Sequence, residues 1–241
     1  LEVEPIDQFL EINELLSKNN MIFLSSFRRD TFFKRYLTKH DIKLTSSISL
    51  ESNFVEKDII TYIPSKLLLP NNPSFIKSTI DNCKKFLFLS KGVSIFLSNE
   101  DNFKIKLATE LASIYGQRVL LENYPNLDNQ IVCASYDWWI NKLHLICPPE
   151  QIIIPLLPFP NMVEPINQET ISSLRNRSKN WFREFMFPEA FQSIDKAVSP
   201  LRKNSGKLII LDGRISNRKW GRDMLEMIQP QKIINYMYPF D

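Results

Sequence analysis

The side chains best suited to chemistry in this sequence are cations close to the ends of apolar segments. Arg202 and Lys203 follow a helical pattern, and Arg214 comes two residues after Asp212, just past the apolar run 207–211. Guanidinium groups bind phosphate oxygens as a bidentate fork, whereas an ammonium group binds them as a point charge. Asp212 and Arg214 follow a central strand, at the sheet edge where α/β proteins place functional groups. An Asp212–Arg214 ion pair that only shapes the turn is an equal alternative.

Aromatic and basic residues elsewhere could contact a nucleic acid. Trp138 and Trp139 could stack on bases, because aromatic rings bind single strands without sequence preference. Packing of one of the two in the core is the alternative. Arg175, Arg177 and Lys179 could follow a phosphate backbone, but a solvated helix face is the simpler interpretation.

Motifs for self-contained catalysis are missing. A phosphate-binding loop needs Gly-x-x-x-x-Gly-Lys-Ser/Thr, yet the only Gly-Lys pair is Gly206-Lys207, with Leu201 at the first glycine position. There is no Gly-x-Gly-x-x-Gly, His-Glu-x-x-His or Gly-x-Ser-x-Gly pattern either. The sequence thus argues against a self-contained nucleotide hydrolase, a dinucleotide dehydrogenase, a zinc protease and an α/β-hydrolase.

Composition sets wide limits. With 241 residues, 44% of them hydrophobic, the chain can bury a substantial core, and a net charge of +3 permits nucleic acid without implying it. The longest apolar run, 151–159, contains two prolines and is far shorter than the roughly 20 residues of a membrane span, so we expect no membrane association. Three widely separated cysteines favour reduced thiols in a cytoplasmic protein. The chain begins at Leu1 without a Met, and we expect this to be a cut end.

Strand-like and helix-like periods alternate along the chain. We expect strands at 21–24, 58–63, 93–97, 118–121, 131–134, 152–157 and 207–211. We expect helices at 6–16, 32–37, 74–89, 101–115, 168–197 with an interruption near Pro188, and 222–228. This order predicts an α/β fold with an open, mainly parallel sheet and helices on both faces.

Four segments in order resemble the second half of the DinG/XPD group of superfamily 2 helicases. Residues 21–27 resemble the family's strand ending in Thr-Ser-Ala-Thr, with Ser26 as the matching side chain. Residues 135–139 resemble the start of Ser-Phe-Trp-Glu-Gly-Val-Asp, and 152–159 with Glu164-Pro165 resemble the following strand, Leu-Pro-Phe and acidic-Pro pair. This second match is the strongest of the four.

The two remaining matches lie towards the end of the chain. Residues 187–190 resemble the Leu-Pro-x-Ala that opens the family's arginine-bearing helix. Residues 206–214 and 220–222 resemble a glycine, an apolar strand, Asp-x-Arg and Tyr-Gly-Lys. The order and separation of the four segments, which span most of the chain, carry the resemblance.

The resemblance implies a RecA-like C-terminal helicase lobe at 46–241, with 1–45 as the tail of the first lobe or a lead-in helix and strand. It also implies an N-terminal lobe, missing here, that holds ATP and Mg²⁺ while this lobe closes over them. Single-stranded DNA would lie on Ser26, Trp138, Trp139 and Arg214. An iron–sulfur cluster is expected only in the missing part.

Departures from the family pattern affect the residues that reach ATP. The family carries Gln-x-x-Gly-Arg-x-x-Arg after Leu-Pro-x-Ala, but the first arginine is absent in every register. Glu, Gly and Asp of the earlier motif are likewise replaced by Ile140, Asn141 and Leu143. Counting from Pro188 places the following residues at the Gln, the Gly, the first Arg and the second Arg of this motif: Lys196, Ser199, Pro200 and Lys203. Arg202 reaches the position of the second Arg if the alignment slips by one residue. Counting from Gln192 places these instead: Asp195, Lys196 and Ser199.

Two functions follow from these departures. Arg202, Lys203 and Lys196 are the candidates for coupling this lobe to ATP in a DNA helicase, and we expect the chain alone not to hydrolyse ATP. The alternative is a degenerate lobe that acts as a non-catalytic module for DNA binding or protein docking. A Rossmann-like small-molecule enzyme has little support because glycine loops are missing.

Overall fold

The computed structural model describes residues 57–234, and every element or site expected before residue 57, including Ser26 and the segment 1–45, lies outside that range. The strands within it are β1 (Ile59–Tyr62), β2 (Ser94–Leu97), β3 (Val119–Leu121), β4 (Ile131–Ala134), β5 (Gln151–Ile154), β6 (Lys207–Ile210) and β7 (Gln231–Ile234). The helices are α3 (Phe75–Leu89), α4 (Asp101–Tyr115), η1 (Gly116–Arg118), α5 (Tyr136–Lys142), α6 (Pro165–Asn176), η2 (Phe182–Met186), α7 (Phe187–Val198), α8 (Leu201–Asn204), α9 (Arg214–Asn217) and α10 (Lys219–Met227).

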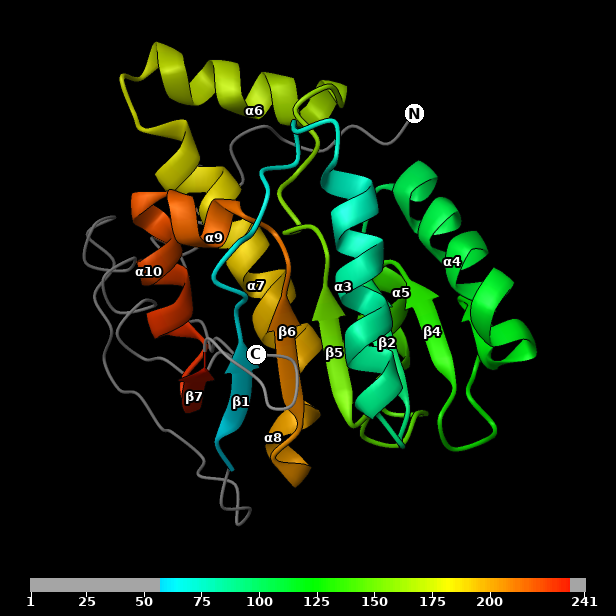
Figure 1. The fold of residues 1–241 in the computed structure, drawn as a ribbon. Helices are drawn as coiled ribbons and strands as arrows, with labels where there is room; N and C mark the ends of the chain where they lie inside the picture. The colour runs from blue at the N-terminus through cyan, green and yellow to red at the C-terminus, as the bar shows by residue number, and fades with distance from the viewer. Residues whose placement is uncertain (1–56, 235–241) are drawn as a thin grey trace.

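The strands form one sheet in the order β3-β4-β2-β5-β6-β1-β7, and every neighbouring pair is parallel (Figure 1). All four residues of β2, β4 and β5 are buried, as expected for parallel strands that are covered on both faces. The α/β fold class expected from the alternating periods is confirmed.

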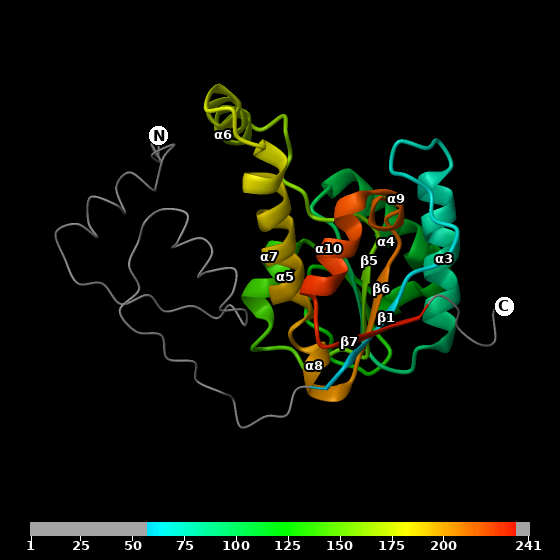
Figure 2. The same ribbon diagram turned by 90° about the vertical axis from the view of Figure 1, so that its left-hand side faces the viewer.

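Two hydrophobic cores lie on opposite faces of this sheet. Side chains of a strand point alternately to the two faces, so Ile95 joins one core and Phe96 the other. One face packs against α3 and α4, and the other against α5, α7 and α10 (Figure 2). The expected coverage of both faces is therefore present.

The long helical region after β5 differs from the expectation. The chain leaves the helical conformation at 177–180, where Ser178 has a φ of +54°, and the α-helical pattern is also interrupted just before Pro188, by the π-helical turn η2. Pro188 lies near the start of α7, which continues from η2 without a gap. A π-helical turn, η2, joins this break to α7. The result is a separate helix, α6, beyond the carboxyl ends of the strands (Figure 1).

Three short helices and one edge strand were not predicted. α5, α8 and α9 have between four and seven residues, too few for a helical period to show, and β7 begins with two polar residues. β5 also ends at Ile154 and not at 157, because Pro155 has no N–H to continue the ladder. In contrast, α4 ends at Gly116 as predicted, where φ is +57°.

The chain reverses its direction across the sheet between β2 and β5. After β2 it passes through α4 to β3 on one side, whereas after β5 it passes through α6 and α7 to β6 on the other. Open α/β sheets bind ligands at such a switch point, outside the carboxyl ends of the strands. Polar side chains at that edge are therefore the first candidates for a functional site.

Candidate functional site

The carboxyl edge holds a buried carboxylate that orients an arginine. Asp212 is completely buried just past β6, and its two oxygens accept hydrogen bonds from Arg214 Nε at 3.0 and 2.9 Å and from Nη2 at 2.6 Å. The backbone N–H of Leu157 donates to Asp212 Oδ2 at 2.9 Å. The Arg214 guanidinium also lies 5.0 Å from the centre of the Phe159 ring. Its side chain remains 28% exposed, so Arg214 presents an immobilised positive charge to solvent.

The start of α5 lies beside this pair. Ser135 caps the helix by accepting a hydrogen bond from the backbone N–H of Trp138, and Asn99 after β2 accepts one from the N–H of Tyr136. The Tyr136 side chain is fully buried, and its hydroxyl has no hydrogen-bond partner among the described residues. Burial, and next the negative charge of Asp212, raise the pKa of Tyr136 well above its ordinary value. Tyr136 therefore stays neutral.

A second ionic cluster stands at the end of β3. Lys104 of α4 is buried, and its Nζ lies 2.7 Å from Glu122 and 2.8 Å from Asp101. Glu122 also accepts a hydrogen bond from the backbone N–H of Ser135 at 2.9 Å. Burial alone would raise the pKa of Glu122, but the bonds from Lys104 and Ser135 outweigh it, so the pKa lies below the usual value. This cluster ties α4 and β3 to the start of α5.

The two tryptophans of the predicted site have different surroundings. Trp139 is fully buried and its Nε1 donates to the backbone oxygen of Ala197 in α7, so it is the core member of the pair. Trp138 is half-buried, and its ring centre lies 5.8 Å from that of the exposed Tyr124. Lys142 lies 5.9 Å from the Tyr124 ring. Of the two tryptophans, only Trp138 offers surface for contact with a base.

The residues proposed to couple with ATP lie far from Arg214 along the strands. α8 comes directly before the amino end of β6, with Arg202 buried and 2% exposed. Arg202 Nη2 donates to Asp195 at 3.0 Å and to the backbone oxygen of Ile228 at 3.1 Å. Lys203 and Lys196 are exposed. The structure therefore separates a buried arginine from two solvent-facing lysines.

Sequence reasoning missed Asn99, Glu122 and Lys104. The polar residues Asn99 and Glu122 closely follow β2 and β3, and that position was the available signal. Nothing in the sequence indicated that Lys104 would be buried, because α4 carries charged residues on several sides. Its partners come from separate elements, so only the folded chain shows the cluster.

The described part of the chain lacks two further kinds of feature. Within residues 57–234, no three His, Cys, Asp or Glu side chains come together as a possible metal site. That region therefore has no set of side chains that fits an iron–sulfur cluster or a protein-held Mg²⁺. The helices of that same region are all too short or too polar to cross a bilayer.

Known proteins with similar sequences or folds are helicases. No protein-family model matches the chain. Over 91 residues it is 29% identical to the ATP-dependent DNA helicase DinG of Photobacterium profundum, a match that covers 36% of this chain and 13% of that protein. Its fold is similar to S. tokodaii Xpd4, with TM-score 0.51, 15% identity, and coverage of 80% of this chain and 41% of that chain. An XPD helicase gives TM-score 0.50, 16% identity and coverage of 75% and 36%.

These comparisons confirm the resemblance to the DinG/XPD helicases and the RecA-like α/β fold. The low identities agree with the altered motifs. The chain spans less than half the length of the helicases it matches. The chain is therefore similar in sequence and fold to part of a helicase.

Proposed function

We propose that the chain acts as the C-terminal lobe of an ATP-dependent DNA helicase resembling DinG, binding single-stranded DNA along the carboxyl edge of its sheet. The observation that carries this proposal is the arginine held ready at that edge, where Asp212 and the Phe159 ring orient the Arg214 guanidinium. A guanidinium fixed in advance loses little rotamer entropy when it binds a phosphate. The similarity to DinG and XPD supports DNA as the ligand.

Trp138 would supply the contact with a base in this proposal. Its half-buried ring, next to Tyr124, offers an aromatic face, while Lys142 adds positive charge nearby. Trp139 would support this surface from the core through its bond to Ala197. Stacking without base-specific hydrogen bonds predicts binding with little sequence preference.

Coupling to ATP would depend on the exposed lysines. In a longer protein this lobe would close over ATP and Mg²⁺ held by an N-terminal lobe, with Lys203 and Lys196 as the cations free to reach the γ-phosphate. Arg202, which is engaged with Asp195 and Ile228, would position α8. Any iron–sulfur cluster would belong to that other part. We place the protein in the cytoplasm, which the buried free thiols Cys83 and Cys133 support.

A second candidate is a degenerate lobe that binds DNA or docks a protein without motor activity. The burial of Arg202 favours it, because an arginine in an internal ion pair must break that pair before it can reach a partner's phosphate. Lysine at the remaining positions cannot replace a bidentate fork. DNA binding is common to both candidates, whereas ATP turnover separates them.

Binding of a fluorescent oligothymidylate to the 241-residue chain, followed by anisotropy, tests the shared part. Replacing Trp138 with Ala should weaken binding about tenfold, given roughly 1–3 kcal/mol for a stacked base. Phe88→Ala is the matched control, since Phe88 is 81% exposed on α3 and lies on the other sheet face. Equal affinities for the parent and the Trp138 variant, or no binding by the parent, would overturn the proposed interface.

DNA-stimulated ATP hydrolysis of the longer protein separates the two candidates. The motor predicts stimulation in the parent and at least about tenfold less in a Lys196→Ala, Lys203→Ala variant, because transition-state cations contribute about 10³ or more. A parent that binds DNA without stimulated hydrolysis would instead establish the non-catalytic module. Lys77→Ala on α3 is an exposed control for loss of charge.

A further inference from the structure

Positive charge is concentrated in two short segments, 175–184 and 214–223. Together they contain eight Lys or Arg residues and two carboxylates, Glu184 and Asp223. The formal net charge of the whole chain is only +3, so everything outside these segments is net negative. Such clustering of cations creates a local positive potential that the small net charge of the whole chain does not reveal.

The fold brings the two segments together at one end of the carboxyl edge. Arg183 and Asp223 form an ion pair at 2.5 Å, and the ring centres of Phe182 and Trp220 lie 5.5 Å apart. Trp220 also packs on Phe159, the ring beneath Arg214. We call this surface, from the end of α6 to the start of α10, the basic corner. It is continuous with the Asp212–Arg214 site.

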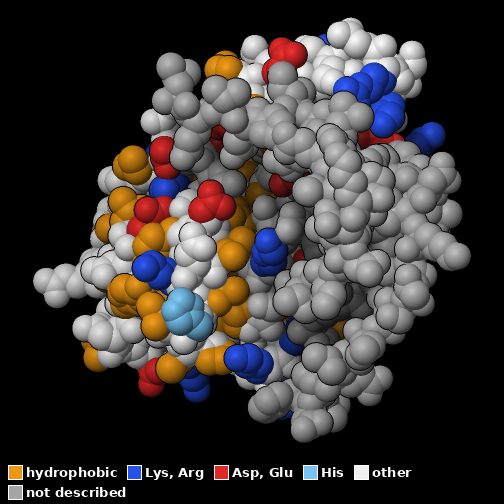
Figure 3. Space-filling view, turned by 180° about the vertical axis from the view of Figure 1, so that it is seen from behind, with side chains coloured by type: hydrophobic (Ala, Val, Ile, Leu, Met, Phe, Trp, Pro, Cys, Tyr) orange, Lys and Arg blue, Asp and Glu red, His pale blue; other side chains and the backbone are white. Residues whose placement is uncertain are grey.

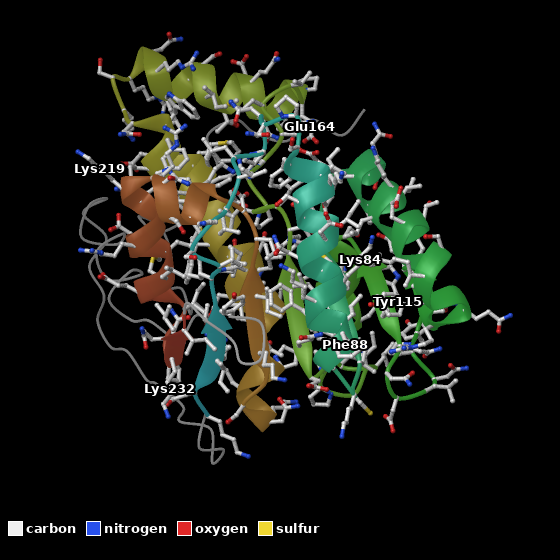
Figure 4. All side chains as sticks on the ribbon, in the orientation of Figure 1. Lys84, Phe88, Tyr115, Glu164, Lys219 and Lys232 are labelled. Carbon is white, nitrogen blue, oxygen red and sulfur yellow. The ribbon has the colours of Figure 1, made fainter. Side chains whose placement is uncertain are left out.

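The cations of the basic corner face solvent. Arg218, Lys219 and Arg222 are all exposed, and Figure 4 shows Lys219 pointing away from the body of the domain at the start of α10. The opposite end of α6 begins at Glu164, which is labelled in the same view. From behind, blue side chains gather at the upper right, at the end of α6 that leads into α7 (Figure 3). The positive charge therefore lies at the end of α6 that leads into α7 and at the start of α10.

The basic corner also contains an aromatic side chain. Trp181 is half-buried, and the Arg175 guanidinium lies 5.3 Å from its ring centre. Cations that follow phosphates, combined with a ring face for a base, are the composition of surfaces that bind single strands. A docking site for an acidic protein would need the cations but not the ring.

We propose that a single-stranded nucleic acid leaves the carboxyl edge over the basic corner, with Arg218, Lys219 and Arg222 neutralising successive phosphates. This path rests on the proposed function, which places a strand at Arg214, and it extends the contact surface beyond that site. The last turn of α6 adds one more cation, Arg175, to the same path.

The test compares charge-removed variants of the 241-residue chain. One variant carries Arg218→Gln, Lys219→Gln and Arg222→Gln. The control carries Lys77→Gln, Lys85→Gln and Lys106→Gln, which remove the same charge from exposed positions on α3 and α4. Oligothymidylate affinity is measured between about 50 and 200 mM salt, where each phosphate contact to a single strand contributes a slope of about 0.7. Circular dichroism checks that each variant is folded.

We expect the corner variant to lower the salt slope by about 2 and to weaken binding on the order of a hundredfold at about 0.1 M salt, with the control close to the parent. A parent that does not bind would overturn the proposed function together with this path. Binding by the parent with an unchanged slope in the corner variant would overturn the path alone. Equal losses in both variants would also overturn it, because only the total charge would then matter. Binding of a polyglutamate peptide to the basic corner as tightly as DNA would overturn the path, because it would identify the corner as a docking site for an acidic protein.

Discussion

The two edges of the sheet use the same residue types in opposite ways. At the amino edge Arg202 is 2% exposed and donates to Asp195 and to a backbone oxygen. At the carboxyl edge Arg214 is 28% exposed, and its carboxylate partner Asp212 is the buried member of the pair. Arg202 is therefore the buried member of its ion pair, whereas Arg214 is the exposed member of its own.

This difference shows how far a motif position can be trusted. The resemblance would place Arg202, with a one-residue slip, at an arginine position of the helicase motif, but its contacts in this structure are internal. Arg214 belongs to the Asp-x-Arg segment of the resemblance, and its side chain is 28% exposed. We expect the burial of each arginine, and not its motif position, to decide whether the side chain stabilises the fold.

The largest effect should come from breaking the amino-edge pair. Arg202→Ala leaves Asp195 and the backbone oxygen of Ile228 without this donor, and should lower the free energy of unfolding by about 3 kcal/mol. Lys203→Ala, one residue away but exposed, should change it by less than about 0.5 kcal/mol. Urea unfolding at neutral pH measures both. Similar midpoints for the two variants would show that Arg202 is not structural.

The next effect concerns the carboxylate that joins β5 to the loop before β2. Glu150 accepts hydrogen bonds from Lys207 Nζ at 3.0 Å, from the N–H of Lys91 at 3.0 Å and from that of Gly92 at 2.6 Å. Glu150→Gln should therefore cost about 1–2 kcal/mol at neutral pH. Glu110→Gln, on the exposed side of α4, is the control and should have no measurable effect.

The cost of Glu150→Gln should disappear in acid. Burial raises the pKa of Glu150, but Lys207 and the backbone donors outweigh it and lower the pKa overall. A group with a lowered folded pKa stabilises the protein above the unfolded value, about 4.3, and loses that contribution as the pH falls through the folded pKa. Unfolding measured from about pH 7 down to about pH 3 follows this loss, and a constant difference across that range would contradict it.

A smaller effect of the same sign is expected at the carboxyl edge. Glu122→Gln weakens the bonds to Lys104 and to the N–H of Ser135, but Asp101 still neutralises Lys104. We expect a loss of about 1 kcal/mol at neutral pH that also fades below about pH 4, because the pKa of Glu122 is lowered too. Thermal unfolding across that pH range measures it. A larger loss in the free energy of unfolding for Glu122→Gln than for Glu150→Gln would contradict this prediction.

The smallest effect should come from Tyr136→Phe. The hydroxyl is buried without a hydrogen-bond partner among the described residues, so its removal should leave stability unchanged or raise it by up to about 1 kcal/mol. Trp139→Phe is the contrasting change, since it removes the bond to Ala197 and leaves a cavity. Clear destabilisation by Tyr136→Phe would mean that the hydroxyl has a partner at the carboxyl edge.

Much of the fold could be predicted because the central strands are apolar at nearly every position and the longer helices have clear ends. Periodicity located β2, β4 and β6 and the end of α4 at Gly116, and the Leu157-Pro-Phe159 and Asp212-x-Arg214 segments indicated the helicase resemblance. The short helices α5, α8 and α9 were missed, because four to seven residues are too few to show a helical period, and so was β7, which begins with two polar residues. The break at 177–180 was missed because that segment contains no Gly or Pro to indicate it.

The sequence by itself determined the residue types, the parallel α/β class and the likeness to DinG and XPD. Only the tertiary structure decided which charges are internal and which face solvent. Arg202 and Lys203 are neighbours in the chain, yet one is buried and the other exposed. Burial depends on partners such as Asp195 and Ile228, which reach α8 from separate elements. The same physical reason joins segments 175–184 and 214–223 into one basic corner, because charge density is a property of positions in space.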